Sequence, residues 1–328
     1  MKWTKLALIA VLVLTLVLGV AATGAQDDSR TVVDALGREV TLDGAPERVV
    51  GMSASITEML FAIGVEPVGA TEGIEYPEGM DELPTFGTGY QPNLEALAEL
   101  EPDLIIANAQ LQAPLVGQLE AIAPTVFVLT LVAADIPANV RLIGEITWSD
   151  ESATALADDY DAFLEQVSDA ASEMDGPSIL IIVGTLDVPN YGKSTTYLGD
   201  MAVMLGATNI ADGEEDAGPF PGYTQLDIER ILEEDPDVIL TVTRGAPGTP
   251  PMPETMSEDP LWSALTAVQE GRVFELDNRL YLEAPGPRFT EAFEGLYTIF
   301  YDEEFELMDD MEAMEEEMEM EEEEAAAE

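Results

Sequence analysis

The chain has 328 residues, a length that favours about two domains, and 47% of its residues are hydrophobic, which is enough to bury a core. It contains no cysteine and no histidine, which excludes disulfides, thiolate or imidazole metal ligands and nucleophiles activated by histidine. A formal net charge of −54 makes nucleic acids and anionic membrane surfaces unfavourable partners.

The N-terminus has the layout of a secretory signal peptide. Lys2 and Lys5 precede an apolar run over 6–20, and small residues follow over 21–25. We therefore expect residues 1–25 to be a cleaved signal and the protein to be periplasmic or otherwise extracytoplasmic. An uncleaved membrane anchor is the alternative, although the run is short for a spanning helix of about 20 residues. Because no cysteine follows the run, we do not expect a lipid-anchored lipoprotein.

The first half of the folded chain alternates strand-length apolar runs with helical patterns. Residues 30–44 predict an edge hairpin, because apolar and polar residues alternate around a glycine turn. A later helix is predicted to begin with a capping box between Ser55 and Glu58. This alternation is typical of a parallel sheet covered on both faces, here in an N-terminal lobe over 30–150. After the hairpin we predict a strand at 48–52, a helix at 53–65, a helix-to-strand unit at 93–106, a helix at 111–122 and a strand at 124–129.

One long helix is predicted between the two halves of the chain. Residues 151–174 place apolar side chains at helical spacing and contain neither proline nor glycine. At 1.5 Å per residue the helix would be about 36 Å long. The following Asp-Gly-Pro sequence is a strong stop signal. We assign residues 151–175 to a stiff connector, which differs from a flexible Gly/Ser linker.

A helix-to-strand unit of the first half recurs in the second half. Residues 93–106 read NLEALAELEPDLII, and residues 227–240 read DIERILEEDPDVIL. At one constant offset, Glu95 matches Glu229 and both copies keep the Pro-Asp pair that ends the helix. A polar cap, apolar positions at helical spacing and a buried strand follow the same order in each copy.

A second unit recurs in the same order. The apolar strand at 178–184 is followed by a helix that carries Asp200 where the first half carries Glu58. Two repeated units predict two related α/β lobes, and we place the C-terminal lobe over 176–301. Its last helix is predicted to begin near Pro287.

The end of the chain, residues 302–328, is a run of glutamate and methionine with few core-forming residues. Such a segment repels itself, so we expect it to be disordered. The strongly acidic surface is typical of a protein kept soluble, including at high salt. An acidic tail that gathers cations is the second interpretation.

In their order and spacing, these motifs resemble the substrate-binding proteins of ABC importers for iron-siderophores, haem and cobalamin. The resemblance covers 31–301 and rests on DALGREVTL, RVVGMSASITEMLFAIG, the two PNLEAL/PDLII-type units, the long helix, and DPLWSAL…GRVFEL followed by GPRF. It implies two Rossmann-like α/β lobes with parallel sheets, joined by one long interlobe helix, with ligand held between the lobes. The branch of the family that holds metal ions with histidines does not fit a chain without histidine.

The resemblance also implies a permease-docking residue at the tip of each lobe. The matching positions are Glu95 and Glu229, which would meet arginines of the membrane permease. A first-turn glutamate also stabilises its own helix dipole and needs no partner for that, so a purely structural role stays open. The stiff helical bridge implies only a small hinge motion.

Ligands of open α/β sheets bind beyond the carboxyl ends of the strands, and tyrosines are frequent in the loops predicted there. Tyrosine presents a flat apolar face and a polar tip, which suits a macrocycle or an aromatic chelate. Each tyrosine could instead pack against its own lobe. Because these loops are rich in tyrosine and poor in arginine, we expect a neutral or weakly anionic ligand. The candidate ligand-binding residues are Ser53, Tyr76, Tyr90, Asn108, Tyr191, Tyr223, Arg244 and Tyr281.

Arg244, the one charged candidate, is expected to point into the cleft and contact the ligand, with pairing to a nearby carboxylate as its alternative. Three other charged residues are expected to have structural roles. Arg288 at the start of the last helix is expected to be structural. We expect Glu58 and Asp200 to be helix caps.

The leading functional hypothesis is a secreted solute-binding protein that delivers a metal-chelate small molecule to an ABC permease. Because no sequence feature requires a partner copy, we expect a monomer. We expect no catalytic residues, no side-chain metal site and no cofactor. One alternative is an exported enzyme on the same scaffold, which would have to use carboxylates, tyrosines or Lys193. The other is a stand-alone surface receptor with no permease.

Overall fold

The computed structural model describes residues 29–303, except residues 75, 78, 172–173, 219–220 and 284. The predicted signal peptide over 1–25 lies outside the described residues, as does the predicted tail over 302–328 apart from its first two residues. None of the helices in the described part has both the length and the apolar character needed to cross a bilayer.

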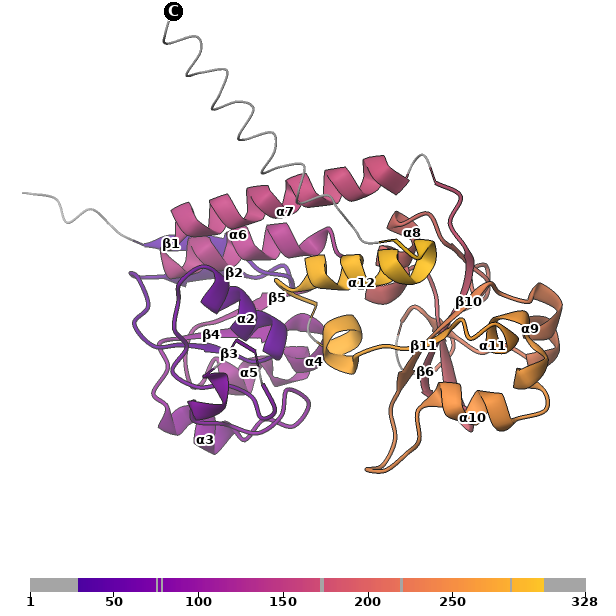
Figure 1. Ribbon diagram of the computed structural model, residues 1–328. Coiled ribbons are helices and arrows are strands. Elements are labelled where there is room, and N and C mark those ends of the chain that lie inside the picture. Colours follow the sequence, from indigo (N-terminus) through magenta and orange to yellow (C-terminus); the bar gives the residue numbers. More distant parts are fainter. Residues whose placement is uncertain are drawn as a thin grey trace, which may run out of the picture.

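The N-terminal lobe is built on the predicted parallel sheet, and the order of its strands is β3-β4-β5 (Figure 1). These strands are almost wholly buried, which explains why their sequences are continuous apolar runs. The predicted N-terminal hairpin is also confirmed, although it forms a two-stranded sheet of its own and not an edge of the main sheet. The elements are β1 (Arg30–Val33), β2 (Glu39–Leu42), β3 (Val49–Gly51), α2 (Ala54–Ala62), η1 (Met80–Glu82), α3 (Leu94–Glu99), β4 (Leu104–Asn108), α4 (Ala109–Gln112), η2 (Ala113–Leu115), α5 (Val116–Leu119) and β5 (Thr125–Val128).

The C-terminal lobe has a mixed sheet. Strands β6, β10, β11 and β8 are parallel, whereas β7 pairs antiparallel with β6 on one side and with β9 on the other. The elements are β6 (Ser178–Thr185), β7 (Val188–Gly192), α8 (Tyr197–Met204), β8 (Thr208–Asn209), β9 (Tyr223–Thr224), α9 (Ile228–Glu234), β10 (Val238–Thr243), α10 (Met252–Glu258), η3 (Trp262–Ala264), α11 (Thr266–Gln269), β11 (Val273–Glu275) and a single π-helical segment, η4 (Arg279–Glu283).

Strand β7 corrects the prediction of a ligand-facing loop after β6. The chain reverses directly at the end of β6, where Gly184 has φ +123° and a Cβ would lie 2.6 Å from the carbonyl oxygen of Val188. Residues 185–192 therefore return along β6 as a hairpin. The proline and glycine of VPNYG hid this strand from the sequence pattern.

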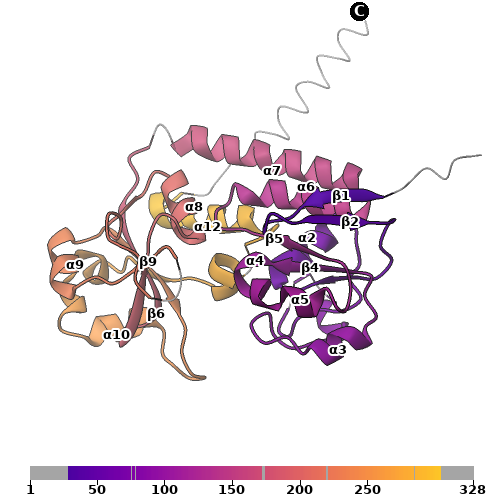
Figure 2. The same ribbon diagram turned by 180° about the vertical axis from the view of Figure 1, so that it is seen from behind.

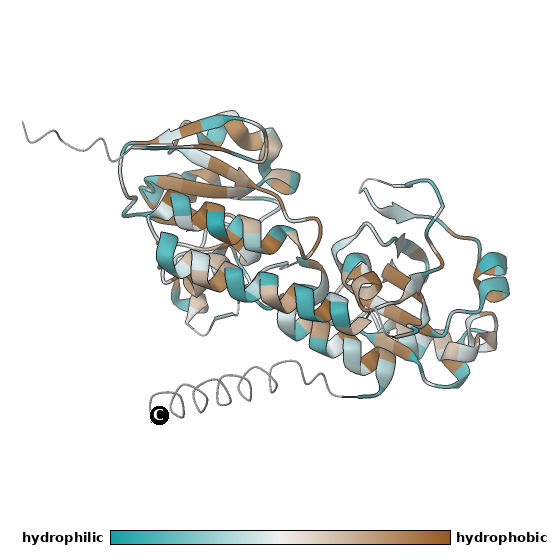
Figure 3. Ribbon diagram, turned by 90° about the horizontal axis from the view of Figure 1, so that it is seen from above, coloured by the Kyte–Doolittle hydropathy of each residue, from teal (hydrophilic) through white to brown (hydrophobic). Residues whose placement is uncertain are grey.

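The helical layer contains a second helix beside the predicted long one, which alone spans the two lobes. The predicted long helix is α7 (Asp150–Ala171), which runs across both lobes in opposite views of the molecule (Figures 1 and 2). Beside it lies α6 (Asp135–Thr147), which the sequence analysis missed. The two helices approach so closely that a Cβ at Gly144 would collide with the Cβ of Ala153. Hydrophilic residues recur along the outer side of this layer, and its apolar residues face inward (Figure 3).

The last helix, α12 (Phe289–Tyr301), packs beneath α7 through an aromatic cluster. The Phe289 ring lies 4.9 Å from Tyr160 and 5.6 Å from Phe163, both in edge-to-face geometry, and Phe293 lies 5.8 Å from Phe163. One continuous core runs from the sheet of the N-terminal lobe through this cluster to the sheet of the C-terminal lobe. The lobes are therefore joined by packing as well as by the chain.

Replacing Phe289 by alanine should lower the free energy of unfolding by about 3–5 kcal/mol, because the side chain is fully buried at the centre of this cluster. Urea denaturation of the two proteins measures the difference. Val203→Ala on the exposed side of α8 is the control and should change stability by no more than about 0.5 kcal/mol. Equal effects of the two substitutions would contradict a shared core between the lobes.

Candidate functional site

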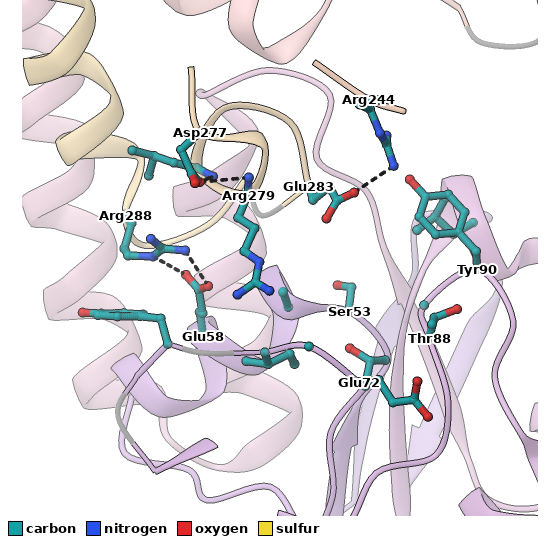
Figure 4. A pocket seen from close by; sticks show the side chains of 18 of the residues that line it. Ser53, Glu58, Glu72, Thr88, Tyr90, Arg244, Asp277, Arg279, Glu283 and Arg288 are labelled. Carbon is teal, nitrogen blue, oxygen red and sulfur yellow. Dashed lines mark hydrogen bonds and ion pairs between the residues drawn. The ribbon is translucent and has the colours of Figure 1, made fainter. Parts of the chain in front are cut away.

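A cavity of about 550 Å³ lies between the two lobes (Figure 4). Its volume is within the range of about 300–1,000 Å³ that is usual for small-molecule sites. Both lobes contribute to its wall, so the relative position of the lobes defines its shape. The N-terminal lobe supplies Ser53, Ala54, Glu58, Thr71, Glu72, Gly73, Ile74, Tyr76, Thr88, Gly89, Tyr90 and Leu111, and the C-terminal lobe supplies Arg244, Asp277, Arg279, Leu280, Glu283, Arg288 and Glu291.

The start of α2 forms part of the N-terminal wall. Ser53 caps this helix: its hydroxyl accepts a hydrogen bond from the backbone N–H of Ile56 and shares another with the Ser55 hydroxyl at 3.0 Å. The predicted capping box between Ser55 and Glu58 is therefore wrong, because the helix begins two residues earlier than that box requires. This cap places Ser53 at the cavity surface.

Tyr76 and Tyr90 offer aromatic surface to the cavity. Their side chains are 48% and 56% exposed in a protein whose other described tyrosines are buried or half-buried. The Arg288 guanidinium lies over the Tyr76 ring, 4.7 Å from its centroid, and Tyr90 lies on the side of the cavity occupied by Arg244 (Figure 4). A ligand in the cavity would cover apolar ring area that is otherwise in contact with water.

An ion pair between Glu58 and Arg288 crosses from one lobe to the other. Arg288 donates through Nε and Nη2 to the two carboxylate oxygens of Glu58, at 3.2 and 3.1 Å, and only 2% of the Glu58 side chain is exposed. Glu58 is thus no helix cap, contrary to the prediction. Arg288 does begin α12, as expected of a structural residue, and it also lines the cavity.

Asp200, the sequence equivalent of Glu58, makes a comparable contact in the opposite direction. Its carboxylate accepts a hydrogen bond of 3.0 Å from the backbone N–H of Ala133, at the approach to α6. The cap of α8 is Thr196, so the prediction that Asp200 is a cap is also wrong. At the seam Glu58 is buried and Asp200 is partly buried, and this loss of solvent raises the pKa of each carboxyl above its ordinary value. The hydrogen bonds from Arg288 and from Ala133 only partly offset that rise.

The structure brings four of the eight predicted ligand-binding residues to the cavity: Ser53, Tyr76, Tyr90 and Arg244. Tyr223 is half-buried beside the core, close enough to Tyr90 and Arg244 for their charges to influence its hydroxyl. Asn108 caps α4 and so positions Leu111, which does line the cavity.

Tyr191 and Tyr281 do not reach the cavity. Tyr191 belongs to a core cluster of the C-terminal lobe, because it lies on β7 rather than in a loop. Tyr281 is buried in the core that joins the lobes, with its hydroxyl against the backbone of Gly295. Ligand contact by these two residues stays a prediction that their position does not favour.

Several polar residues of the cavity were not singled out from the sequence. The expectation of arginine-poor loops is wrong, because Arg244, Arg279 and Arg288 all line the cavity. The loops predicted to face the ligand include the one that contains Arg279, but the residue expected to contact the ligand there is Tyr281. On the π-helical segment η4, Tyr281 points to the core while Figure 4 shows the Arg279 guanidinium directed into the cavity.

Glu95 and Glu229 occupy matching places on the two lobes. Each lies in the first turn of a short helix, α3 or α9, with its side chain exposed. Neither carboxylate forms an ion pair with another residue in the described part of the chain. Their exposure is compatible with docking, which stays a prediction.

Two α/β lobes, a helical layer between them and a ligand-sized cavity at their seam define a two-lobe solute-binding protein. Residues 49–280 match the model of the family described as "Periplasmic binding protein", and the chain belongs to this family, which confirms the resemblance seen in the motifs.

Relatives with known names span several chelates. The Fe(3+)-citrate-binding protein YfmC of Bacillus subtilis is 26% identical over 278 residues, which cover 81% of this chain and 84% of that protein. The cobalamin-binding protein of Halobacterium salinarum is 25% identical over 279 residues, 83% of this chain and 74% of that protein. The crystal structure of the petrobactin-binding protein YclQ from Bacillus subtilis has a TM-score of 0.71 at 20% identity and covers 83% of this chain and 98% of that one. At this identity the structural likeness shows the fold alone.

Replacing Arg288 by methionine should destabilise the protein by about 2 kcal/mol at pH 7, because Glu58 would stay buried without its counter-charge. In the double variant with Glu58→Gln the stability should largely return, since no unpaired charge remains. Urea denaturation of the wild type, both single variants and the double variant measures the coupling. Strictly additive losses would contradict a stabilising pair across the seam.

The loss of stability caused by Arg288→Met, which is the deficit relative to the wild type, should also depend on pH. Because the pKa of Glu58 is raised in the folded state, protonation of this carboxyl favours folding below that pKa, and this contribution is lost as the pH rises through it. The deficit should therefore shrink as the pH falls from 7 towards the raised pKa. A deficit that grows on acidification would contradict the assignment of Glu58 as the unpaired group.

Proposed function

We propose that the protein is an extracytoplasmic solute-binding protein that delivers a metal chelate, either an iron-siderophore or a related complex such as haem or cobalamin, to the permease of an ABC importer. The observation that carries this proposal is the cavity of about 550 Å³, whose wall combines exposed tyrosines of one lobe with arginines of the other. The proposal is also supported by membership of the periplasmic binding protein family and by relatives that are named as Fe(3+)-citrate-binding and cobalamin-binding proteins.

The geometry suits capture by the two lobes acting as a pair. Tyr76 and Tyr90 supply aromatic faces from the N-terminal lobe, while on the C-terminal side Arg244 lies near Tyr90 and Arg279 points into the cavity (Figure 4). Since the core and the helical layer continue across the seam, closure on the ligand would be a small hinge motion. The same rigidity would hold Glu95 and Glu229 at a nearly fixed spacing for a permease.

Equilibrium titration tests the proposal. The protein should bind at least one of three classes of probe, ferric siderophores, haemin or cobalamin, and the bound chelate should quench tyrosine and tryptophan emission. Tyr90→Ala should weaken binding about tenfold, because one aromatic contact contributes roughly 0.5–1.5 kcal/mol beyond its buried area. Tyr191→Phe is the matched control and should leave the dissociation constant unchanged, since Tyr191 lies in the core.

No quenching or retention of any of these chelates would contradict the proposed function. A loss of affinity in the Tyr191→Phe protein, with none in the Tyr90→Ala protein, would place the ligand elsewhere. Circular dichroism of both variants shows whether an altered affinity comes from altered folding.

Docking through the lobe tips is tested by uptake. In cells that express the complete importer, Glu95→Ala and Glu229→Ala should each reduce chelate uptake, and the double variant should abolish it, while the affinity of the purified protein for chelate stays constant. Glu99→Ala, a change of another exposed glutamate on α3, serves as the control. Normal uptake by the double variant would contradict a docking role.

A further inference from the structure

The charged side chains of the cavity are mostly negative. Five carboxylates and three guanidinium groups line it, which leaves a formal charge of −2. The carboxylates come from both lobes: Glu58 and Glu72 from the N-terminal lobe, and Asp277, Glu283 and Glu291 from the C-terminal lobe. A ligand between the lobes therefore meets negative groups on both sides.

Two of the three guanidinium groups are already neutralised by carboxylates of the same wall. Arg288 is paired with Glu58 through two hydrogen bonds, and this pair is nearly closed to solvent on the Glu58 side. Arg244 is paired with Glu283 at 2.9 Å (Figure 4). An anionic ligand that binds either arginine would share it with a carboxylate whose negative charge stays close by, or would have to displace that carboxylate. Displacing Glu58 would leave a carboxylate buried and unpaired.

The groups outside these pairs are three carboxylates and one guanidinium. Glu72 and Glu291 are exposed, and neither forms an ion pair with another described residue. The Asp277 carboxylate accepts hydrogen bonds from the backbone N–H groups of Arg279 and Leu280, which fix its position but leave its charge. Arg279 also has an interaction partner within the chain. The cavity thus offers an anion little uncommitted positive charge.

We propose that this cleft selects a metal chelate without net negative charge, that is, a cationic or uncharged complex such as a ferric hydroxamate or a corrinoid, over a polycarboxylate complex such as ferric dicitrate. This inference rests on the proposed function and narrows it. Like charges placed opposite one another across an interface oppose binding, and each anionic group of a ligand would face Glu72, Asp277 or Glu291. The exposed faces of Tyr76 and Tyr90 provide contact that needs no ligand charge.

A series of probes that differ only in charge tests the inference. Ferrioxamine B carries a terminal ammonium group, its N-acetyl derivative is uncharged, and its N-succinyl derivative is anionic, while the iron-hydroxamate core stays the same. Equilibrium dialysis with metal analysis, extended to cyanocobalamin and ferric dicitrate, gives the dissociation constants. Within the series, we expect affinity to fall about tenfold from the cationic to the anionic member, and the difference to shrink at high salt.

A substitution of one cavity carboxylate identifies the source of the preference. Glu72→Gln should reduce the ratio of cationic to anionic affinity about threefold to tenfold, since it removes one negative charge from the wall while keeping its size. Glu99→Gln, which removes an exposed charge on α3 outside the cavity, should leave the ratio unchanged.

The possible outcomes separate the inference from the proposed function. If the anionic derivative or ferric dicitrate binds as tightly as the cationic and uncharged complexes, or more tightly, the inference is overturned while the proposed function stands. An unchanged ratio in the Glu72→Gln protein also overturns it. If none of these chelates, nor haemin, is retained at all, the proposed function fails and the inference fails with it.

Discussion

The packing of α12 against α7 is the interaction on which the rest of the structure depends. The helix comes from the end of the folded chain and inserts Phe289 and Phe293 against the centre of the bridging helix. Because the same apolar core continues into both sheets, this contact fixes how the lobes face each other. Arg288 immediately precedes α12, so the packing also determines where its guanidinium meets Glu58 in the wall of the cavity. The shape of the cleft thus depends on the packing of the core as much as on the loops that line it.

The internal repeat explains the polar contacts at the seam. Glu58 and Asp200 occupy equivalent positions on α2 and α8, and each holds a partner outside its own half of the chain. Each of these carboxylates lies at the edge of its own lobe, where that lobe meets the other, related lobe. Once two such lobes are set against a shared helical layer, Glu58 becomes buried and Asp200 partly buried, and each accepts a hydrogen bond from across the seam. The repeat therefore supplies the two halves and also a means of joining them.

Local patterns predicted the order of strands and helices, the two lobes and the bridging helix, because each of these depends on short-range spacing of apolar residues. Ser53, Tyr76, Tyr90 and Arg244 also lie at the cavity, since they follow strands whose ends converge, and their contact with a ligand stays a prediction. The direction of individual side chains could not be predicted in this way. Tyr191 became part of a core because an unexpected strand, β7, carries it inward.

The missed elements have comparable causes. Helix α6 has Pro137 in its first turn and was not recognised, although a proline there removes no helical hydrogen bond. The pairing of Arg288 with Glu58 joins residues 230 positions apart, and no local pattern could reveal it. That pairing also bears on the charge of the cleft. In a chain with only 12 lysines and arginines against 66 acidic residues, three arginines are concentrated in one cavity, and two of them are paired there with carboxylates. Their effect is to bring a strongly acidic surface close to neutrality where a ligand must lie, rather than to create a site for anions.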